Sequence, residues 1–169
     1  ELLLEEAADL DQRAARAGAD VEALREELGQ PAPEPQIAVA PDADLRWIET
    51  QRDEAASAAA RAAARVEALE AEQARRESRL AEIPGQLDAS RGSLAGAREA
   101  LSASAPEGQP AAVTSPRRLL ARARIEAAQA EIAKLTSEQR SYEARSELLL
   151  LRMDQARRAS SRAAAEAEQ

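Results

Sequence analysis

Apolar residues recur at alternating steps of three and four along three stretches of the chain, a spacing typical of helices that pack as a coiled coil. The first stretch has its apolar positions at Leu3, Ala7, Leu10, Ala14, Ala17, Val21, Leu24 and Leu28. Gly29 follows where a helix cap is expected, and Pro31 cannot continue a helix. The pattern predicts a first helix over residues 1–29.

A proline-rich segment separates the first stretch from the second. Residues 30–42 contain Pro31, Pro33, Pro35 and Pro41. Such a composition favours the polyproline II conformation, which acts as a stiff spacer. We therefore expect residues 30–42 to be a connector between two helices.

The second stretch keeps a single heptad register over a long distance. Either Asp42 or Asp44 can cap its first free amides. The seam positions are Leu45, Ile48, Arg52, Ala55, Ala59, Ala62, Val66, Leu69, Gln73, Arg76, Leu80, Ile83, Leu87, Ser90, Leu94, Ala97 and Leu101. Gln73 and Arg76 are polar positions on this seam, where they either specify register or, as is commoner, mark a solvated part of the helix. The pattern predicts a long helix over residues 43–103.

Pro84 lies inside this second helix. Proline removes one backbone donor and clashes with the carbonyl of Leu80, which costs about 3 kcal/mol in a helix interior. Gly85 weakens the same turn further. Because the heptad register is the same on both sides, we expect a kink or a short break near Pro84 rather than a reversal of the chain. Gly92 and Gly96 indicate a locally weak helix.

The third stretch follows a predicted loop over residues 104–115. Ser115 before Pro116 is a strong helix start signal, which predicts a closing helix over residues 116–168. The seam positions of this helix are Ile125, Ala128, Ile132, Leu135, Gln139, Tyr142, Ser146, Leu149, Met153 and Ala156. The four leucines Leu148–Leu151 widen the apolar face to most of a turn. We expect this patch to contact more than one neighbour, in the same domain or in a second chain.

These patterns predict an all-α fold, an elongated antiparallel coiled coil of two to three long helices. A loop of the length of residues 104–115 favours an antiparallel pairing of the two helices that it joins. The sequence leaves open whether the first helix packs on this pair, and whether the seams close within one chain or between chains of a homo-oligomer. Since the chain begins at Glu1 without an initiator methionine, we expect one helical domain of a larger protein.

Composition and charge narrow the range of functions. The chain has a formal net charge of −8 with basic residues scattered among acidic ones, which argues against nucleic acid as a partner. It contains no cysteine and no histidine, so catalytic sets and metal sites that need either residue are excluded. The longest run of large apolar residues, Leu148–Leu151, is far too short to span a membrane. Because the apolar seams are largely alanine and the charges are mixed, direct lipid binding is not expected either.

No catalytic, cofactor-binding or metal-binding residue is predicted, and no cofactor. Glu143 and Glu147 would share a helix face and could hold a cation, although a solvated charged face is far commoner. Carboxylates two apart, such as Glu70 and Glu72, do not face each other on a helix. Trp47 is expected to be a packing anchor near the start of its helix.

Two segments resemble a known family. Leu80–Leu101 (LAEIPGQLDASRGSLAGAREAL) is similar to the proline-interrupted helix of the so-called porin domain in large MscS-type mechanosensitive channels of the MscK (KefA) kind. Ala123–Ala156 is similar to that domain's closing helix, in which a leucine-rich patch precedes a short charged segment, here Arg152 and Asp154. The resemblance covers roughly residues 45–160.

This resemblance implies a periplasmic helical extension of a mechanosensitive ion channel in the inner membrane of a Gram-negative bacterium. Such an extension would be a structural spacer, assembly element or partner-sensing arm without catalytic residues. Its partners would be proteins or neighbouring subunits bound through the helical seams, and it would meet the membrane only through the parent channel. Two alternatives remain open: a cytosolic coiled-coil scaffold, such as an arm of a chromosome or repair ATPase, and the helical hairpin of a periplasmic efflux adaptor.

Overall fold

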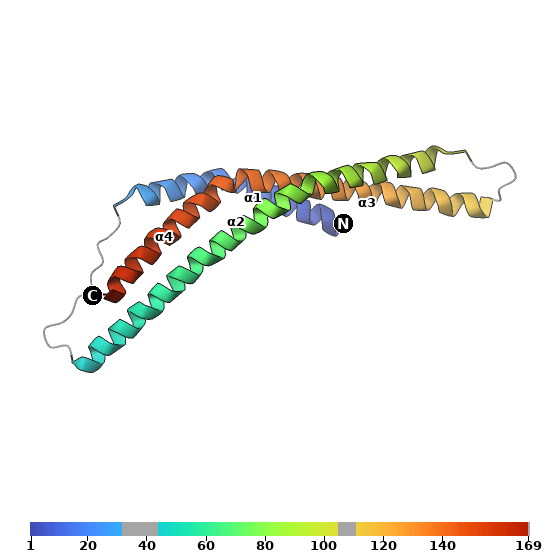
Figure 1. Cartoon of the computed structure of the whole chain (residues 1–169). Coiled ribbons are helices and arrows are strands. Elements are labelled where there is room, and N and C mark those ends of the chain that lie inside the picture. Colours follow the sequence, from blue (N-terminus) through green and yellow to red (C-terminus); the bar gives the residue numbers. More distant parts are fainter. Residues whose placement is uncertain (32–43, 105–110, 169) are drawn as a thin grey trace. The chain divides into compact units, whose positions relative to one another are not determined.

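The computed structural model describes residues 1–31, 44–104 and 111–168, and within them the chain forms helices and no strand (Figure 1). The helices are α1 (Leu2–Gly29), α2 (Leu45–Ser102), α3 (Ala111–Ala144) and α4 (Ser146–Glu168). The predicted all-α fold is confirmed. The connector and the loop, apart from Gln30, Pro31, Ser104 and residues 111–115, lie outside the described residues.

The chain packs as two compact units rather than as one, and two helices contribute to both. Unit 1 contains α1 up to Arg16, α2 from Ser78 onward, and α3. Unit 2 contains α1 from Ala17 onward, α2 up to Glu77, and α4. Each unit therefore has segments of three helices, and the first helix contributes to both units.

The core of unit 1 is an apolar cluster between α2 and α3. Ile83 and Leu87 of α2 are buried against Leu135 of α3, and Leu80, Ile132 and Tyr142 pack around them. Farther along, Ala97 and Ala100 of α2 line the same groove as Arg117 and Ala121 of α3. From the first contact to the second, the residue numbers rise in α2 and fall in α3. Helices α2 and α3 therefore run antiparallel, as the sequence predicts.

The core of unit 2 consists of two apolar clusters that share α4. Leu69 of α2 packs with Leu149, Met153 and Ala156 of α4, while Val21 and Leu24 of α1 pack with Leu148. The expectation that the Leu148–Leu151 patch meets more than one neighbour is confirmed, and both neighbours belong to the same chain. Leu150 alone of the four leucines is exposed, at 57%.

The predicted seams hold over most of the chain. Every seam position of α1, and every seam position of α2 from Ala55 to Leu101, is buried or half-buried. The prediction is wrong in the first turns of α2, where Leu45 and Ile48 are exposed, at 78% and 43%. The half-buried residues there are Trp47, Gln51 and Ala55. They follow one another at steps of four without the steps of three that a heptad seam requires.

The predicted break in the second helix is absent, since α2 continues through Pro84 to Ser102. Pro84 and Gly85 both face solvent, whereas Ile83 before them is completely buried. Proline in this place removes a single ladder hydrogen bond and leaves the packed face of the helix intact. Burial of Ile83 and Leu87 on both sides of the weak turn offsets that local cost.

The third predicted helix differs from the structure at both its start and its middle. Helix α3 already begins at Ala111, so Pro116 lies inside it and Ser115 is not its cap. Alanine is the best helix former, which explains how Ala111 and Ala112 extend the helix ahead of the proline. The helix is then interrupted at Arg145, next to Ser146, the one position of that seam that is exposed and has no apolar side chain to bury.

Side chains close the helix ends at two places. Asp44 caps α2, because its Oδ1 accepts a hydrogen bond from the backbone amide of Trp47 at 2.7 Å. At the end of α1, the guanidinium of Arg158 donates to the carbonyl oxygen of Leu28 at 2.9 Å. Arg158 thereby supplies a positive charge where a helix C-terminus favours one.

Candidate functional site

Charged side chains from three helix segments meet at one level of unit 1, and we refer to them as the ionic layer. The layer consists of Glu6 of α1, Arg79 of α2, and Lys134, Glu138 and Tyr142 of α3. It borders the apolar cluster of Ile83, Leu87 and Leu135, because Glu138 lies one turn beyond Leu135 on α3. The heptad seams thus bring the layer together as a consequence of apolar packing.

Arg79 and Glu138 form the centre of the ionic layer. The Nε of Arg79 donates to Glu138 Oε1 at 2.8 Å, and Nη2 donates to Oε2 at 2.9 Å. This is the two-pronged geometry in which guanidinium and carboxylate groups bind most strongly. The remaining nitrogen, Nη1, donates to Gln86 at 2.9 Å and to Glu82 at 3.3 Å, so partners surround the guanidinium.

Both groups of this pair are held in their charged forms. Glu138 is only 8% exposed, and burial by itself would raise the pKa of its carboxyl group. The hydrogen bonds from Arg79 outweigh burial and lower this pKa below its ordinary value, helped by the charge of Arg79, by a hydrogen bond from Tyr142 and by the charge of Lys134. The pKa of Arg79 is raised, chiefly by its hydrogen bonds to Glu138.

The first helix joins the ionic layer through Lys134. Its Nζ lies 2.5 Å from a carboxylate oxygen of Glu6, which ties α1 to α3. An open groove of about 280 Å³ lies beside the layer, and Glu6, Asp9 and Leu10 of α1 line it together with Arg79 and Lys134. A lowered carboxyl pKa and a raised guanidinium pKa keep Glu138 and Arg79 as an ion pair near neutral pH. The layer is therefore suited to fixing how the helices pair.

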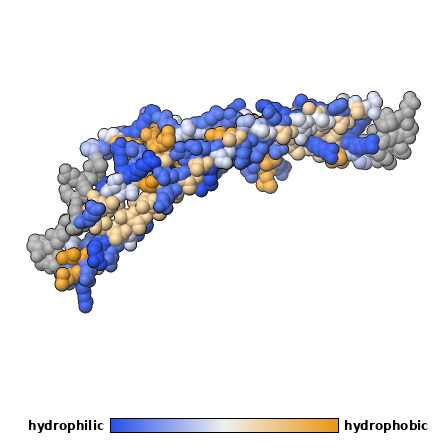
Figure 2. Space-filling view, viewed as in Figure 1, coloured by the Kyte–Doolittle hydropathy of each residue, from blue (hydrophilic) through white to orange (hydrophobic). Residues whose placement is uncertain are grey.

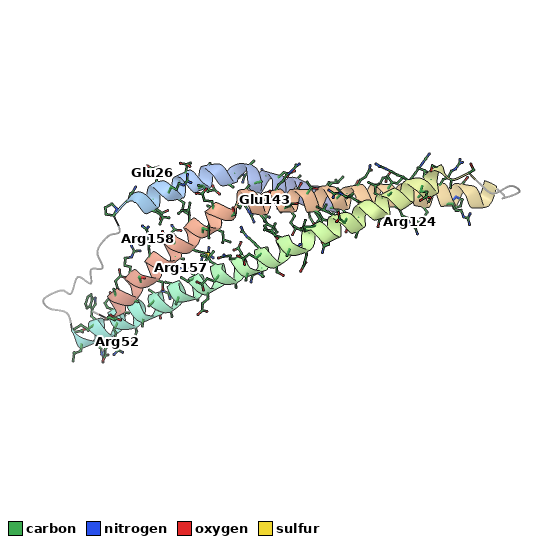
Figure 3. The ribbon with its side chains drawn as sticks, turned by 45° about the horizontal axis from the view of Figure 1, so that its top comes forward. Glu26, Arg52, Arg124, Glu143, Arg157 and Arg158 are labelled. Carbon is green, nitrogen blue, oxygen red and sulfur yellow. The ribbon has the colours of Figure 1, made fainter. Side chains whose placement is uncertain are left out.

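Unit 2 has cross-helix polar contacts of its own, which lie nearer the solvent. Arg157 of α4 pairs with Glu70 of α2 at 2.9 Å, and Gln155 of α4 donates to Glu27 of α1 at 2.6 Å. Arg25 of α1 pairs with Glu147 of α4. In Figure 3, the consecutive residues Arg157 and Arg158 point toward α2 and α1 respectively. Exposed pairs contribute little stability each, so their main effect is on register.

The two carboxylates considered as a cation site lie in different helices, since Glu143 belongs to α3 and Glu147 to α4. Glu143 accepts a hydrogen bond from Gln139 at 2.9 Å, and Glu147 pairs with Arg25. Over residues 1–31, 44–104 and 111–168, no three potential ligands are grouped in a way that could hold a metal ion.

The polar seam positions turn out to be packed rather than solvated. The side chain of Arg76 is only 14% exposed and pairs with Glu72, and Gln73 is half-buried while donating to Glu77 at 2.9 Å. The interpretation of a solvated seam is therefore wrong at Arg76, where the carboxylate of Glu72 pairs with a largely buried guanidinium group. Glu70 and Glu72 pair with different arginines, in agreement with their spacing of two.

The seam pattern does not predict the ionic layer, because the central residues of the layer lie beside the seams rather than on them. Arg79 comes directly before the seam residue Leu80, and Glu138 directly before the seam residue Gln139. Such flanking positions are where coiled-coil helices exchange salt bridges. Opposite charges beside the seams of two antiparallel helices were the signal that could have identified this pair.

The exposed large apolar residues are scattered over the helices: Leu2, Leu4, Leu45, Ile48, Leu119, Leu120 and Leu150. On the face shown in Figure 2, hydrophilic side chains predominate and apolar ones form small groups. None of the four helices, over the residues that the structure describes, is long and apolar enough to cross a membrane.

Comparison of the chain with protein-family models, with curated proteins and with solved structures gave no match.

Proposed function

We propose that this chain is a non-catalytic helical extension of a mechanosensitive channel, on the periplasmic side of the inner membrane, that acts as a spacer or partner-sensing arm. The observation that carries the non-catalytic part is the use of its buried charges. Arg79 and Glu138, the central pair of the ionic layer, are engaged with each other and with neighbouring helix residues. They hold helices together, as expected of a structural or interaction module.

The assignment to a channel is supported by the two segments that resemble the porin domain of large MscS-type channels. Leu80–Leu101 lies in α2, and Ala123–Ala156 extends from α3 into α4. Helices α2 and α3 run antiparallel in unit 1. A proline inside the first of them, Pro84, is accommodated within a helix. The proposal combines that resemblance with a helical architecture in which two antiparallel helices are followed by the Leu148–Leu151 patch.

A helical arm of this kind would act on a channel by differential binding. A partner that binds the arm more tightly in one state of the channel shifts the gating equilibrium by the difference between the two binding free energies. The module itself does not have to change its conformation for this effect. It needs a defined helix register, which cross-helix pairs such as Arg79–Glu138 and Glu6–Lys134 provide.

The test is deletion of residues 1–169 from the full-length parent protein, followed by patch-clamp recording from membranes that contain it. The expected result is a channel that still conducts but opens at a changed membrane tension, because the pore lies elsewhere in the chain. A full-length Leu150→Asp variant is the matched control and should gate like the parent, since Leu150 is exposed. A parent protein without channel activity, or a deletion with unchanged gating, would contradict the proposal.

A further inference from the structure

A groove in unit 2 lies where α1 ends and where α2 and α4 pass beside it. Its volume is about 480 Å³, and the apolar residues that line it are Leu28, Pro31, Ala156 and Ala159. Four arginines also line it: Arg65 from α2, and Arg152, Arg158 and Arg162 from α4. The groove therefore combines a small apolar surface with a concentration of guanidinium groups from two helices.

The charge of this groove is opposite to that of the chain as a whole. The chain has a formal net charge of −8, yet among the described residues Glu27 is the one carboxylate that lines the groove against four arginines. Gln155 donates a hydrogen bond to Glu27 at 2.6 Å, so that carboxylate already has a partner. A local excess of positive charge in an acidic protein attracts anions to this place.

The four arginines differ in how firmly neighbouring residues hold their side chains. Arg158 is held in position, because it donates to the carbonyl of Leu28 at 2.9 Å and pairs with Asp154 at 3.0 Å. Arg162 lies 3.9 Å from Glu166, which is a long contact. The side chains of Arg65 and Arg152 make no hydrogen bond or ion pair with any other residue that the structure describes. Two guanidinium groups on different helices thus line one groove with their donors available.

We propose that this groove binds an oxyanion ligand with at least two negative charges, through Arg65 and Arg152. A guanidinium group has paired donors that match the oxygens of a phosphate or a carboxylate, and two of them suit a ligand with two anionic groups. Leu28 and Ala156 would contact the carbon skeleton of an organic ligand. The inference does not depend on the proposed function, because it concerns a groove within unit 2 alone.

The experiment is a titration of the isotope-labelled chain with pyrophosphate and, separately, with citrate, followed by NMR. Sodium chloride at matched ionic strength corrects for screening. The expected result is a saturable shift of signals from groove residues, among them the Gln155 side-chain amide. Saturation by pyrophosphate alone identifies a phosphate ligand, by citrate alone a carboxylate ligand, and by both a shared oxyanion site. Absence of saturable shifts with either anion would overturn the proposal.

Two variants of equal charge separate a site from general attraction. Arg65→Gln combined with Arg152→Gln should weaken binding at least about tenfold, since two charge-assisted hydrogen bonds are lost. The control combines Arg75→Gln with Arg118→Gln, two exposed arginines outside the groove, and should bind like the parent chain. Equal weakening in both variants would overturn the proposal. If the variant with Arg65→Gln and Arg152→Gln lost helicity by circular dichroism, the shifts in the unaltered chain would decide. Shifts of groove residues would support the proposal, and shifts elsewhere would overturn it.

Discussion

Leu148 and Leu149 are consecutive residues of α4, yet they pack against different helices of unit 2. Leu148 lies with Val21 and Leu24 of α1, whereas Leu149 lies with Leu69 of α2. Successive side chains on a helix point about 100° apart, so neighbouring leucines can serve two interfaces. Helix α4 therefore joins α1 and α2 in this unit, and the widened apolar patch is what allows it to do so.

Replacing Leu149 with aspartate should unfold unit 2. Leu149 is 6% exposed, and the change would place a carboxylate among Leu69, Met153 and Ala156. The loss of apolar burial and the desolvation of a charge together should cost at least about 4 kcal/mol. Urea denaturation followed by circular dichroism at the helix band measures this loss.

Leu150→Asp is the matched control for that experiment. Leu150 is the adjacent residue of the same helix but is 57% exposed, so the same substitution should change stability by about 0.5 kcal/mol or less. Equal effects of the two substitutions would mean that the α4 register described for unit 2 is wrong.

Replacing Pro84 with alanine should stabilise unit 1. Because α2 is helical on both sides of Pro84, alanine restores a backbone donor and removes a clash, for a gain of up to about 3 kcal/mol. Gly85→Ala should add a smaller gain of about 0.5–1 kcal/mol, since nothing lies within 4 Å of a Cβ built there. Thermal melting measures both gains, and an unchanged melting temperature for Pro84→Ala would place the proline in a non-helical break.

The Arg79–Glu138 pair should show strong energetic coupling in a double-mutant cycle. Arg79→Met and Glu138→Gln should each cost about 1.5–3 kcal/mol, because each removes one charged partner of a two-pronged ion pair between the helices. The double variant should cost less than the sum of the singles, with a coupling of at least about 1 kcal/mol.

The same cycle on Arg157 and Glu70 supplies the comparison. This pair also crosses between helices, but its side chains are 58% and 49% exposed. Its coupling should therefore be at most about 0.5–1 kcal/mol. If both cycles gave equally small couplings, the ionic layer of unit 1 would not determine how its helices pair.

Acid should remove the contribution of Glu138 to stability. The pKa of this carboxyl is lower in the folded chain than its ordinary value of 4.5, so the unfolded chain binds the proton more readily. The contribution is complete above about pH 4.5 and is lost as the pH falls through the folded-state value. The stability difference between the parent chain and Glu138→Gln should shrink as the pH is lowered from 4.5 in urea titrations. A difference that stays constant over this range would contradict the lowered pKa.

The heptad pattern predicted most of what packs in this chain, because burial of alanine and leucine at alternating steps decides which face of each helix turns inward. Local propensity was less reliable at the two prolines. It predicted a kink or a short break at Pro84 and a helix start at Pro116, but α2 continues through the first without a break and α3 begins ahead of the second. The heptad pattern gave no indication of the interruption at Arg145, since the heptad spacing of the seam continues across it.

The candidate site was less predictable than the fold. Arg79 and Glu138 are far apart in the sequence, and both lie beside the seams rather than on them. Their pairing depends on the alignment of α2 against α3, which the contact between Ile83 and Leu135 sets. The groove at the end of α1 depends in turn on how α1 lies against α4, which the sequence left open.

The most direct test of the proposed channel extension is the sequence of the complete open reading frame that contains residues 1–169. We expect a signal peptide upstream and several hydrophobic segments of about 20 residues downstream, which would place this helical module before a membrane channel. Flanking sequence with a phosphate-binding loop, or without any membrane-spanning segment, would contradict the proposal and would favour a soluble coiled-coil scaffold.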